Sequence, residues 1–155
     1  GCDSPTLEGL MSSIPIVDDE KLNITIEDIH TIYLSHFDQS DGFSKTGGMH
    51  SASLLDKNGH LMVMKEDIGR HNAVDKVVGH AILEKKIEQA VVLLVSGRIG
   101  WDIVAKAGRM GIGTIVGLGA CSTLAAAAAR SSNISIISFL KNDSAVVIGS
   151  LKIQM

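Results

Sequence analysis

The chain has 155 residues, of which 45% are apolar, with a mean hydropathy of +0.26 and a formal net charge of −3. This length is sufficient for one domain with a substantial hydrophobic core, and the composition excludes an intrinsically disordered chain. The weak negative charge offers no basic surface for DNA or RNA, and no apolar run is long enough to cross a membrane.

Cysteine usage and the N-terminus bear on the compartment. Two cysteines, Cys2 and Cys121, are too few for a disulfide framework, and no signal peptide is visible. A reducing, cytoplasmic location is the simpler interpretation. Because the chain begins at Gly1 and not at Met, we expect that part of the native N-terminus is missing.

The N-terminal region carries one of the two thiols. Residues 1–24 contain Pro5 and Pro15 and are expected to form a mobile segment ahead of a single domain at residues 25–155. Cys2 lies in a polar, glycine-containing stretch, and an accessible thiol reacts when its thiolate is stabilised. It is therefore either a reactive cysteine or an incidental terminal one.

A helix and a hairpin are predicted next. Residues Thr25–Ser40 have helical apolar spacing, with Thr25 as the N-cap. Met49–Leu55 and Leu61–Met64 are expected to form two strands, because an Asn-Gly turn signal lies between them. His50, at the start of the hairpin, could orient a thiol, donate to an anion or fill the strand face.

The most polar stretch of the chain, K-E-D-I-G-R-H-N, leads into a helix predicted over Arg70–Glu84 by apolar residues at i, i+3, i+4 spacing. Backbone N–H groups at a helix N-terminus favour anions, so this turn is a candidate site. In the structural alternative, Asp67 and Asn72 cap backbone groups. Arg70 then pairs with Glu66 or Asp67.

The rest of the chain alternates between apolar runs, typical of strands covered on both faces, and helical patterns. The predicted elements are strand Ala90–Val95, helix Ile99–Met110, strand Thr114–Leu118, helix Ser122–Arg130, and strands Ser135–Leu140 and Ala145–Ile153. Arg98, in a Ser-Gly-Arg turn, could bind a phosphate bidentately or pair with Asp102. Cys121, just before a helix N-terminus, is either a rival reactive cysteine or a small buried residue in a tight turn.

The order of elements favours an α/β fold of three layers, with a mixed sheet between helices on both faces. Sheets of this kind bind ligands at the carboxyl ends of their strands. The turns that follow the predicted strands are therefore expected to form the binding edge.

Four segments, in order along the chain, resemble the FdhD family of formate dehydrogenase accessory sulfurtransferases. They are T-G-G-M-H-S-A from Thr46, E-D-I-G-R-H-N-A-V-D-K from Glu66, S-G-R-I-G-W-D-I-V-A-K-A from Ser96 and F-L-K-N-D-S from Phe139. The resemblance implies a cytidine-deaminase-like fold. A zinc deaminase needs Cys and His ligands where this chain has R-H-N and S-G-R-I, so no metal site is expected.

The resemblance also implies a function and a set of site residues. A cysteine desulfurase would pass sulfur to Cys2 as a persulfide, for delivery to the molybdenum cofactor that formate dehydrogenase requires. That cofactor, molybdopterin guanine dinucleotide, is expected to contact His50, Arg70, His71, Arg98, Phe139, Leu140, Lys141, Asn142, Asp143 and Ser144. Helix N-termini and basic side chains suit its pyrophosphate. The resemblance to this family also implies that the chain could form a homodimer.

Departures from the family pattern keep alternatives open. Asp3 stands where the family has glycine, and Pro5 stands where it has a second cysteine. Ser144 replaces a basic residue, and Cys121 replaces a proline, which argues against family chemistry at Cys121. The chain could therefore be a chaperone that binds the cofactor without transferring sulfur. A generic nucleotide-binding module, which would prefer ATP over guanine ligands, is a weaker alternative.

Overall fold

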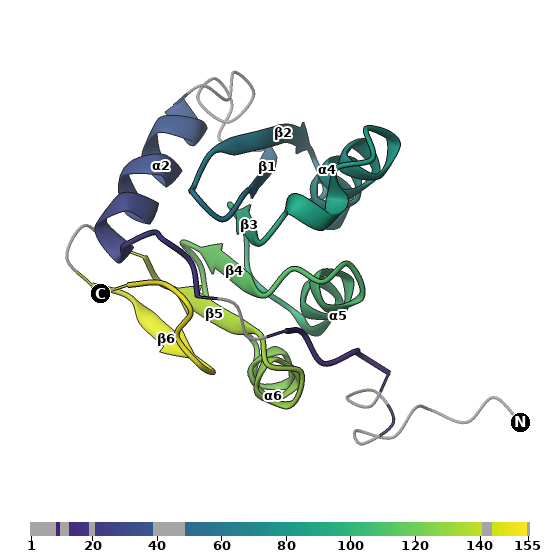
Figure 1. Ribbon diagram of the computed structural model, residues 1–155, viewed down its shortest axis with the longest axis vertical. Helices are drawn as coiled ribbons and strands as arrows, with labels where there is room; N and C mark the ends of the chain where they lie inside the picture. Colours follow the sequence, from purple (N-terminus) through teal and green to yellow (C-terminus); the bar gives the residue numbers. More distant parts are fainter. Residues whose placement is uncertain (1–8, 10–12, 19–20, 39–48, 141–143, 155) are drawn as a thin grey trace, which may run out of the picture.

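The computed structural model describes residues 9, 13–18, 21–38, 49–140 and 144–154. They form a six-stranded sheet in the order β2-β1-β3-β4-β5-β6, with helices on both faces, so the predicted α/β architecture with a mixed sheet is confirmed (Figure 1). The elements are α2 (Ile26–Asp38), β1 (His50–Leu55), β2 (Leu61–Asp67), α4 (Arg70–Leu83), the 3-10 helix η1 (Ile87–Gln89), β3 (Val92–Val95), α5 (Trp101–Arg109), β4 (Thr114–Gly117), α6 (Thr123–Ser131), β5 (Ser135–Ser138) and β6 (Val146–Ile148).

The strand directions place several chain segments at one edge of the sheet. Strands β3, β4 and β5 are parallel, whereas the hairpin β1-β2 and the edge strand β6 pair antiparallel to their neighbours. Because β1 runs against β3, its first residue lies at the carboxyl edge of β3, and the end of β2 lies beside it. None of the described helices is long and apolar enough to span a membrane.

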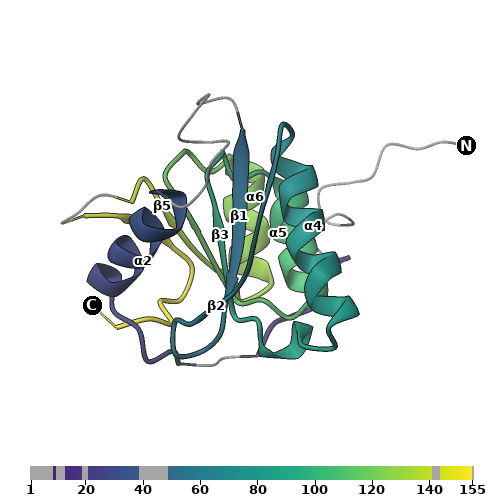
Figure 2. The same ribbon diagram turned by 90° about the horizontal axis from the view of Figure 1, so that it is seen from above.

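The sheet separates two apolar clusters, and Figure 2 shows from above the helices that lie on its two faces. Helices α4, α5 and α6 cover one face and α2 covers the other. Side chains alternate along each strand, so Leu93 packs with the three helices and Leu94 packs with α2. Burial on both faces explains why the central strands consist of continuous apolar residues.

The segment before α2 is partly built into the core. Ile14 and Val17 are buried beneath α5 and α6, in the same cluster as the helices of that face. The N–H of Val17 donates to the carbonyl of Ser132 at 2.9 Å, and the Asn133 amide donates to the carbonyl of Val17 at 3.0 Å. A Cβ on Gly108 would lie 2.4 Å from Ile14 Cγ2, so glycine is required for this contact. Part of the region that the sequence assigns to a mobile segment thus packs against the domain.

Two predicted element ends can be compared with the structure. Thr25 caps α2 as predicted, because its hydroxyl accepts from the N–H of Asp28 at 3.0 Å. The last strand, predicted to continue to Ile153, ends at Ile148, because Gly149 has φ of +82° and turns the chain away.

Candidate functional site

Three helices begin at the carboxyl edge of the sheet. α4 follows β2, α5 follows β3 and α6 follows β4, so their N-termini point toward the same edge. The N-caps of α4 and α5 are glycines, Gly69 and Gly100, and no side chain caps either helix through a hydrogen bond. In α6, Ser122 accepts from the N–H of Ala125 at 3.0 Å. The first turns of α4 and α5 therefore keep backbone donors available for an anion.

The end of β3 is tied to the start of β1 through serine and histidine side chains. The N–H of Ser51 donates to Ser96 Oγ at 2.9 Å, and the N–H of Ser96 donates to the carbonyl of Ser51 at 3.1 Å. Ser96 Oγ also lies 3.4 Å from His50 Nδ1. The network fixes the imidazole of His50 at the edge of the sheet, where the sequence predicted a site residue.

Gly97 is the point at which His50 and Arg70 meet. A Cβ placed on Gly97 would lie 3.1 Å from His50 Nδ1 and 3.3 Å from Arg70 Cδ. Two residues that are far apart in the sequence thus pack over one glycine of the Ser-Gly-Arg turn. The Nε of Arg70 is buried and has no hydrogen-bond partner among the described residues. A buried guanidinium donor normally has an acceptor, so this group is suited to an incoming anion.

The carboxylate of Asp67 organises the turn before α4. It accepts from the N–H of Gly69 at 2.8 Å and from the Asn72 amide at 3.1 Å, and it lies 2.9 Å from Lys76 Nζ. The bond to Lys76, followed by those to Gly69 and Asn72, lowers the pKa of Asp67 to about 2. Of the two ion pairs that the structural alternative allowed for Arg70, the one with Asp67 is wrong, because the Asp67 carboxylate pairs with Lys76 instead. The side chain of Arg70 lies instead at the edge of the sheet, beside Gly97.

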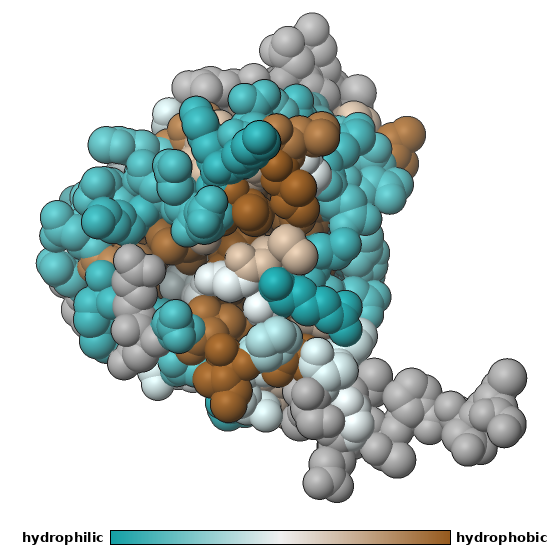
Figure 3. Space-filling model, turned by 45° about the vertical axis from the view of Figure 1, so that its right-hand side comes forward, coloured by the Kyte–Doolittle hydropathy of each residue, from teal (hydrophilic) through white to brown (hydrophobic). Residues whose placement is uncertain are grey.

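The first turns of α4 and α5 are joined across a shallow cavity of about 200 Å³. His71 Nε2 lies 3.6 Å from Asp102 Oδ2, and Lys106 Nζ lies 2.7 Å from Asp75 Oδ1. In Figure 3 the side of the molecule that carries α4 and α5 is turned forward, and it shows apolar surface flanked by polar side chains. The described partner of Asp102 is therefore His71 and not Arg98, the pairing considered from the sequence. Arg98 itself is exposed.

The turn after β5 joins the same edge. The N–H of Phe139 donates to the carbonyl of Gly119 at 3.4 Å, and the N–H of Leu140 donates to the carbonyl of Gly117 at 3.3 Å. The side chain of Phe139 is 47% exposed, whereas Leu140 is buried in the core beneath α2. Phe139 can therefore contact a ligand, and Leu140 supports the turn from below. Ser144 is exposed, and residues 141–143, which were also predicted to bind the cofactor, lie outside the described ranges.

Of the two cysteines, only Cys121 lies within the described ranges. It is half-buried beside Ile99, with which it forms a parallel bridge, and its thiol donates to the carbonyl of Ser122 at 3.3 Å. Burial raises the pKa of Cys121, and the positive charge of Arg130 opposes the effect in part. The thiolate-favouring influence of the helix, expected from the sequence, is thus outweighed by desolvation. Cys2, the predicted carrier of sulfur, lies outside the described residues.

Tyr33 is a site-supporting residue that the sequence did not indicate. It is fully buried on α2, and its hydroxyl donates to the carbonyl of Val95 and accepts from the N–H of Leu118. Burial raises the pKa of Tyr33 above its usual range. The hydroxyl holds together the ends of β3 and β4 from the face that α2 covers, opposite α4, α5 and α6. In the sequence Tyr33 was only one member of an apolar stripe, and no local signal marks its partners.

The described residues contain no group of three or more His, Cys, Asp or Glu side chains that could hold a metal ion. Among the described residues, the carboxyl edge brings the imidazoles of His50 and His71 and the guanidinium groups of Arg70 and Arg98 to helix starts that lack a side-chain cap. Such a donor set suits a multiply charged oxyanion.

Comparison with known proteins identifies relatives of the chain. A model of the FdhD/NarQ family matches residues 1–150. The protein named sulfur carrier protein FdhD from Thermoplasma acidophilum is 48% identical over 101 residues, which are 65% of this chain and 36% of the relative. The protein of the same name from Mycobacterium tuberculosis is 45% identical over 103 residues, which are 66% of this chain and 37% of the relative. The chain thus matches little more than a third of the length of these relatives.

A solved structure resembles the fold as a whole. The crystal structure of a candidate formate dehydrogenase accessory protein from Desulfotalea psychrophila superimposes with a TM-score of 0.79 at 26% sequence identity. The superposition covers 94% of this chain and 62% of that one.

Proposed function

Since the chain belongs to the FdhD/NarQ family, we propose that it carries sulfur to the molybdenum cofactor used by a formate dehydrogenase. Relatives that share nearly half of their aligned residues with it are named sulfur carrier proteins, and a protein of the same fold is described as a candidate formate dehydrogenase accessory protein. The observation that carries the proposal is the convergence of His50 and Arg70 on Gly97, at an edge with two uncapped helix starts.

The sulfur would be carried by Cys2. Its thiolate attacks the outer sulfur of a cysteine desulfurase persulfide, forming a new S–S bond while the old S–S bond breaks. The products are a persulfide on Cys2 and the free thiolate of the desulfurase, so no external oxidant or reductant is required.

Covalent geometry allows Cys2 to reach the carboxyl edge. Ile14, the first buried residue of the described segment, packs against Gly108 near the C-terminal end of α5. The 12 Cα-to-Cα steps from Cys2 to Ile14 can span at most about 40 Å. α5 has nine residues and is therefore about 14 Å long, so the distance from its end to the carboxyl edge is well within reach.

The acceptor would be molybdopterin guanine dinucleotide, bound as a substrate at the carboxyl edge. Its pyrophosphate suits the N-termini of α4 and α5 together with Arg70 and Arg98. Phe139 offers an exposed ring for stacking, and residues 141–144 would complete the guanine end of the site. His50 and His71 would lie near the reacting sulfur, where a protonated imidazole stabilises a thiolate.

Two experiments test the proposal. Calorimetric titration with guanosine diphosphate should give saturable binding, and ATP should bind more weakly; no binding of the guanine nucleotide would count against the site. Mass spectrometry after incubation with a cysteine desulfurase and cysteine should show a gain of one sulfur atom on the protein. Cys2→Ala should abolish that gain, whereas the matched variant Cys121→Ala should keep it.

A second function is favoured by one feature of the sequence. Pro5 stands where the family has its second cysteine, so the chain could bind and deliver the cofactor without transferring sulfur. In that case guanosine diphosphate would still bind, but no sulfur would be gained in the presence of desulfurase. The same mass measurement therefore separates the two functions.

A further inference from the structure

Ser96 connects the end of β3 to the start of β1 and lies beside an imidazole. Its side chain is half-buried, and its Oγ accepts from the N–H of Ser51 at 2.9 Å. The same oxygen lies 3.4 Å from Nδ1 of His50. The hydroxyl therefore stands between a backbone donor and one nitrogen of a ring that the proposed function places near the ligand.

The hydrogen of this hydroxyl has one acceptor among the described residues. A serine hydroxyl has one hydrogen and two lone pairs, and the N–H of Ser51 uses one lone pair. The O–H is then directed to Nδ1 of His50. In a neutral imidazole one nitrogen accepts and the other carries the hydrogen. Ser96 thus selects the form of His50 that carries its hydrogen on Nε2.

The Nε2 of His50 is open to a ligand. A Cβ on Gly97 would lie 3.1 Å from Nδ1 and 3.2 Å from Cε1, so this side of the ring rests on the glycine. Nε2 has no partner within the described ranges and is not one of their buried unpaired atoms, so solvent reaches it. The same Cβ would lie 3.3 Å from Arg70 Cδ, and the adjoining Nε of Arg70 also lacks a described partner. Two donor groups thus meet over one glycine.

We propose that Ser96 is a positioning residue, which holds His50 as a hydrogen-bond donor toward the anionic ligand of the carboxyl edge. The inference rests on the proposed function, because it takes the pyrophosphate of a guanine dinucleotide as the acceptor for Nε2–H. It also chooses among the roles that the sequence left open for His50. A ring that carries its hydrogen on the exposed nitrogen donates to an anion and does not take the proton of a thiol there.

The hydrogen bonds form one chain with a single direction. The N–H of Ser51 donates to the serine oxygen, the O–H donates to Nδ1, and Nε2–H is left to donate to the ligand. Bonds in such a chain polarise one another, so an anion at Nε2 strengthens the contact between the serine and the ring. The separation of 3.4 Å between Ser96 Oγ and Nδ1 is long for a hydrogen bond, and we expect the bound ligand to shorten it.

The first measurement is nitrogen NMR of the imidazole rings in the chain without ligand, with the His50 signals assigned through His50→Gln. At about pH 8.5, about two units above the ordinary pKa of histidine, His50 should carry its hydrogen on Nε2 alone. Ser96→Ala should give a mixture of both forms, and Ser96→Thr, which keeps the hydroxyl, should restore the single form. Ser53→Ala is the matched control, because its buried hydroxyl has no partner in the described part of the chain.

The second measurement is calorimetric titration with guanosine diphosphate. Ser96→Ala should weaken binding by about fivefold, which corresponds to one hydrogen bond, whereas Ser53→Ala should bind as the unsubstituted chain does. His50→Ala should weaken binding by about tenfold. His50→Gln, whose amide N–H can replace Nε2–H, should restore most of the affinity.

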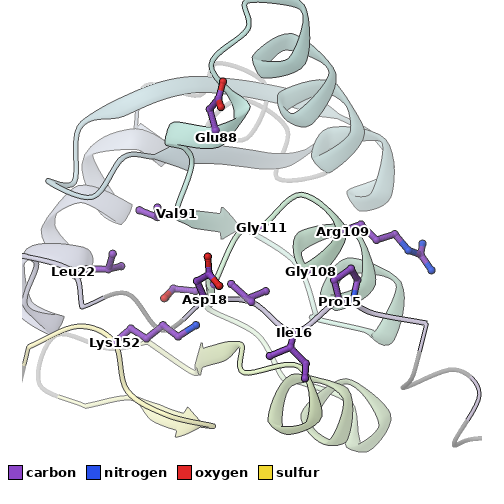
Figure 4. A pocket seen from close by; sticks show the side chains of 13 residues that line it. Pro15, Ile16, Asp18, Leu22, Glu88, Val91, Gly108, Arg109, Gly111 and Lys152 are labelled. Carbon is purple, nitrogen blue, oxygen red and sulfur yellow. The ribbon is translucent and has the colours of Figure 1, made fainter.

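The position of the bound nucleotide is checked against a separate cavity. This cavity has a volume of about 360 Å³ and lies at the opposite edge of the sheet, where Val91, Gly113 and residues 15–18 line it (Figure 4). A nucleotide bound there would be insensitive to Ser96. Amide NMR shifts confined to this cavity would therefore overturn the inference.

Two further results would also overturn it. They are a hydrogen on Nδ1 of His50 in the unsubstituted chain, and equal affinities of Ser96→Ala and Ser53→Ala for guanosine diphosphate. If Ser96→Ala does not fold, the ring signals of the unsubstituted chain and the comparison of His50→Ala with His50→Gln decide instead, and equal losses in that pair would contradict the donor role. Absence of nucleotide binding would count against the proposed function, whereas the wrong form of His50 in a chain that binds overturns this inference alone.

Discussion

Replacing Gly97 by alanine tests the convergence of side chains at the carboxyl edge. The new Cβ would lie 3.1 Å and 3.2 Å from two atoms of the His50 ring and 3.3 Å from Arg70 Cδ, where ordinary contact begins at 3.4 Å. Both neighbours must move by a few tenths of an ångström. We expect the free energy of unfolding to fall by about 1 kcal/mol, at the lower end for overpacking because both neighbours are side chains.

The effect on binding should be larger than the effect on stability. Displacing Arg70 and His50 weakens a charge-assisted hydrogen bond to the ligand, so the affinity for guanosine diphosphate should fall by about tenfold. Gly79→Ala is the matched control, because a Cβ there meets no atom within 4 Å and Gly79 lies in the second half of α4, away from the helix N-terminus. Calorimetric titration and urea denaturation of the two variants give the comparison. Equal affinities in the two variants would refute the reasoning.

Three further substitutions follow from individual contacts. Tyr33→Phe should lower the free energy of unfolding by about 1–3 kcal/mol in urea denaturation, because the buried backbone groups at the ends of β3 and β4 lose their partner. An unchanged midpoint would contradict that role. The pKa of Asp67 is lowered from 3.8 to about 2, so its contribution to stability is present above pH 3.8 and is lost as the pH falls toward about 2. Asp67→Asn should therefore flatten the stability profile in that window, measured by thermal unfolding, and an equally steep profile would count against the Lys76 contact. Gly79→Ala, in the interior of α4 with no atom near the new Cβ, should raise the free energy of unfolding by about 0.5–1 kcal/mol, and a loss of stability would show hidden crowding.

The sequence predicted the elements well because their patterns are local. The continuous apolar run before Ser96 specifies a strand buried on both faces, and the spacing after Arg70 specifies a helix with one buried side. Element order also predicted that the turns carrying the candidate site residues share one edge of the sheet. The predicted last strand is too long because apolar residues continue beyond Gly149, whose positive φ ends the strand.

The contacts of the site could not be predicted from the same patterns. The sequence left open an ion pair of Arg70 with Glu66 or Asp67, but the helix brings Lys76 to the carboxylate of Asp67. The packing of His50 and Arg70 over Gly97 joins three segments, and no local rule reports a contact of that kind. The burial that raises the pKa of Cys121 is likewise a property of the folded chain and not of its neighbours in sequence.

Mapping the amide NMR shifts of the folded chain during a titration with guanosine diphosphate tests the central claim most directly. The account predicts that the largest shifts fall on Gly97, Gly119 and Phe139, where three strand ends and the turns after them meet. Shifts confined to the opposite edge, around Val91 and Gly113, would contradict it.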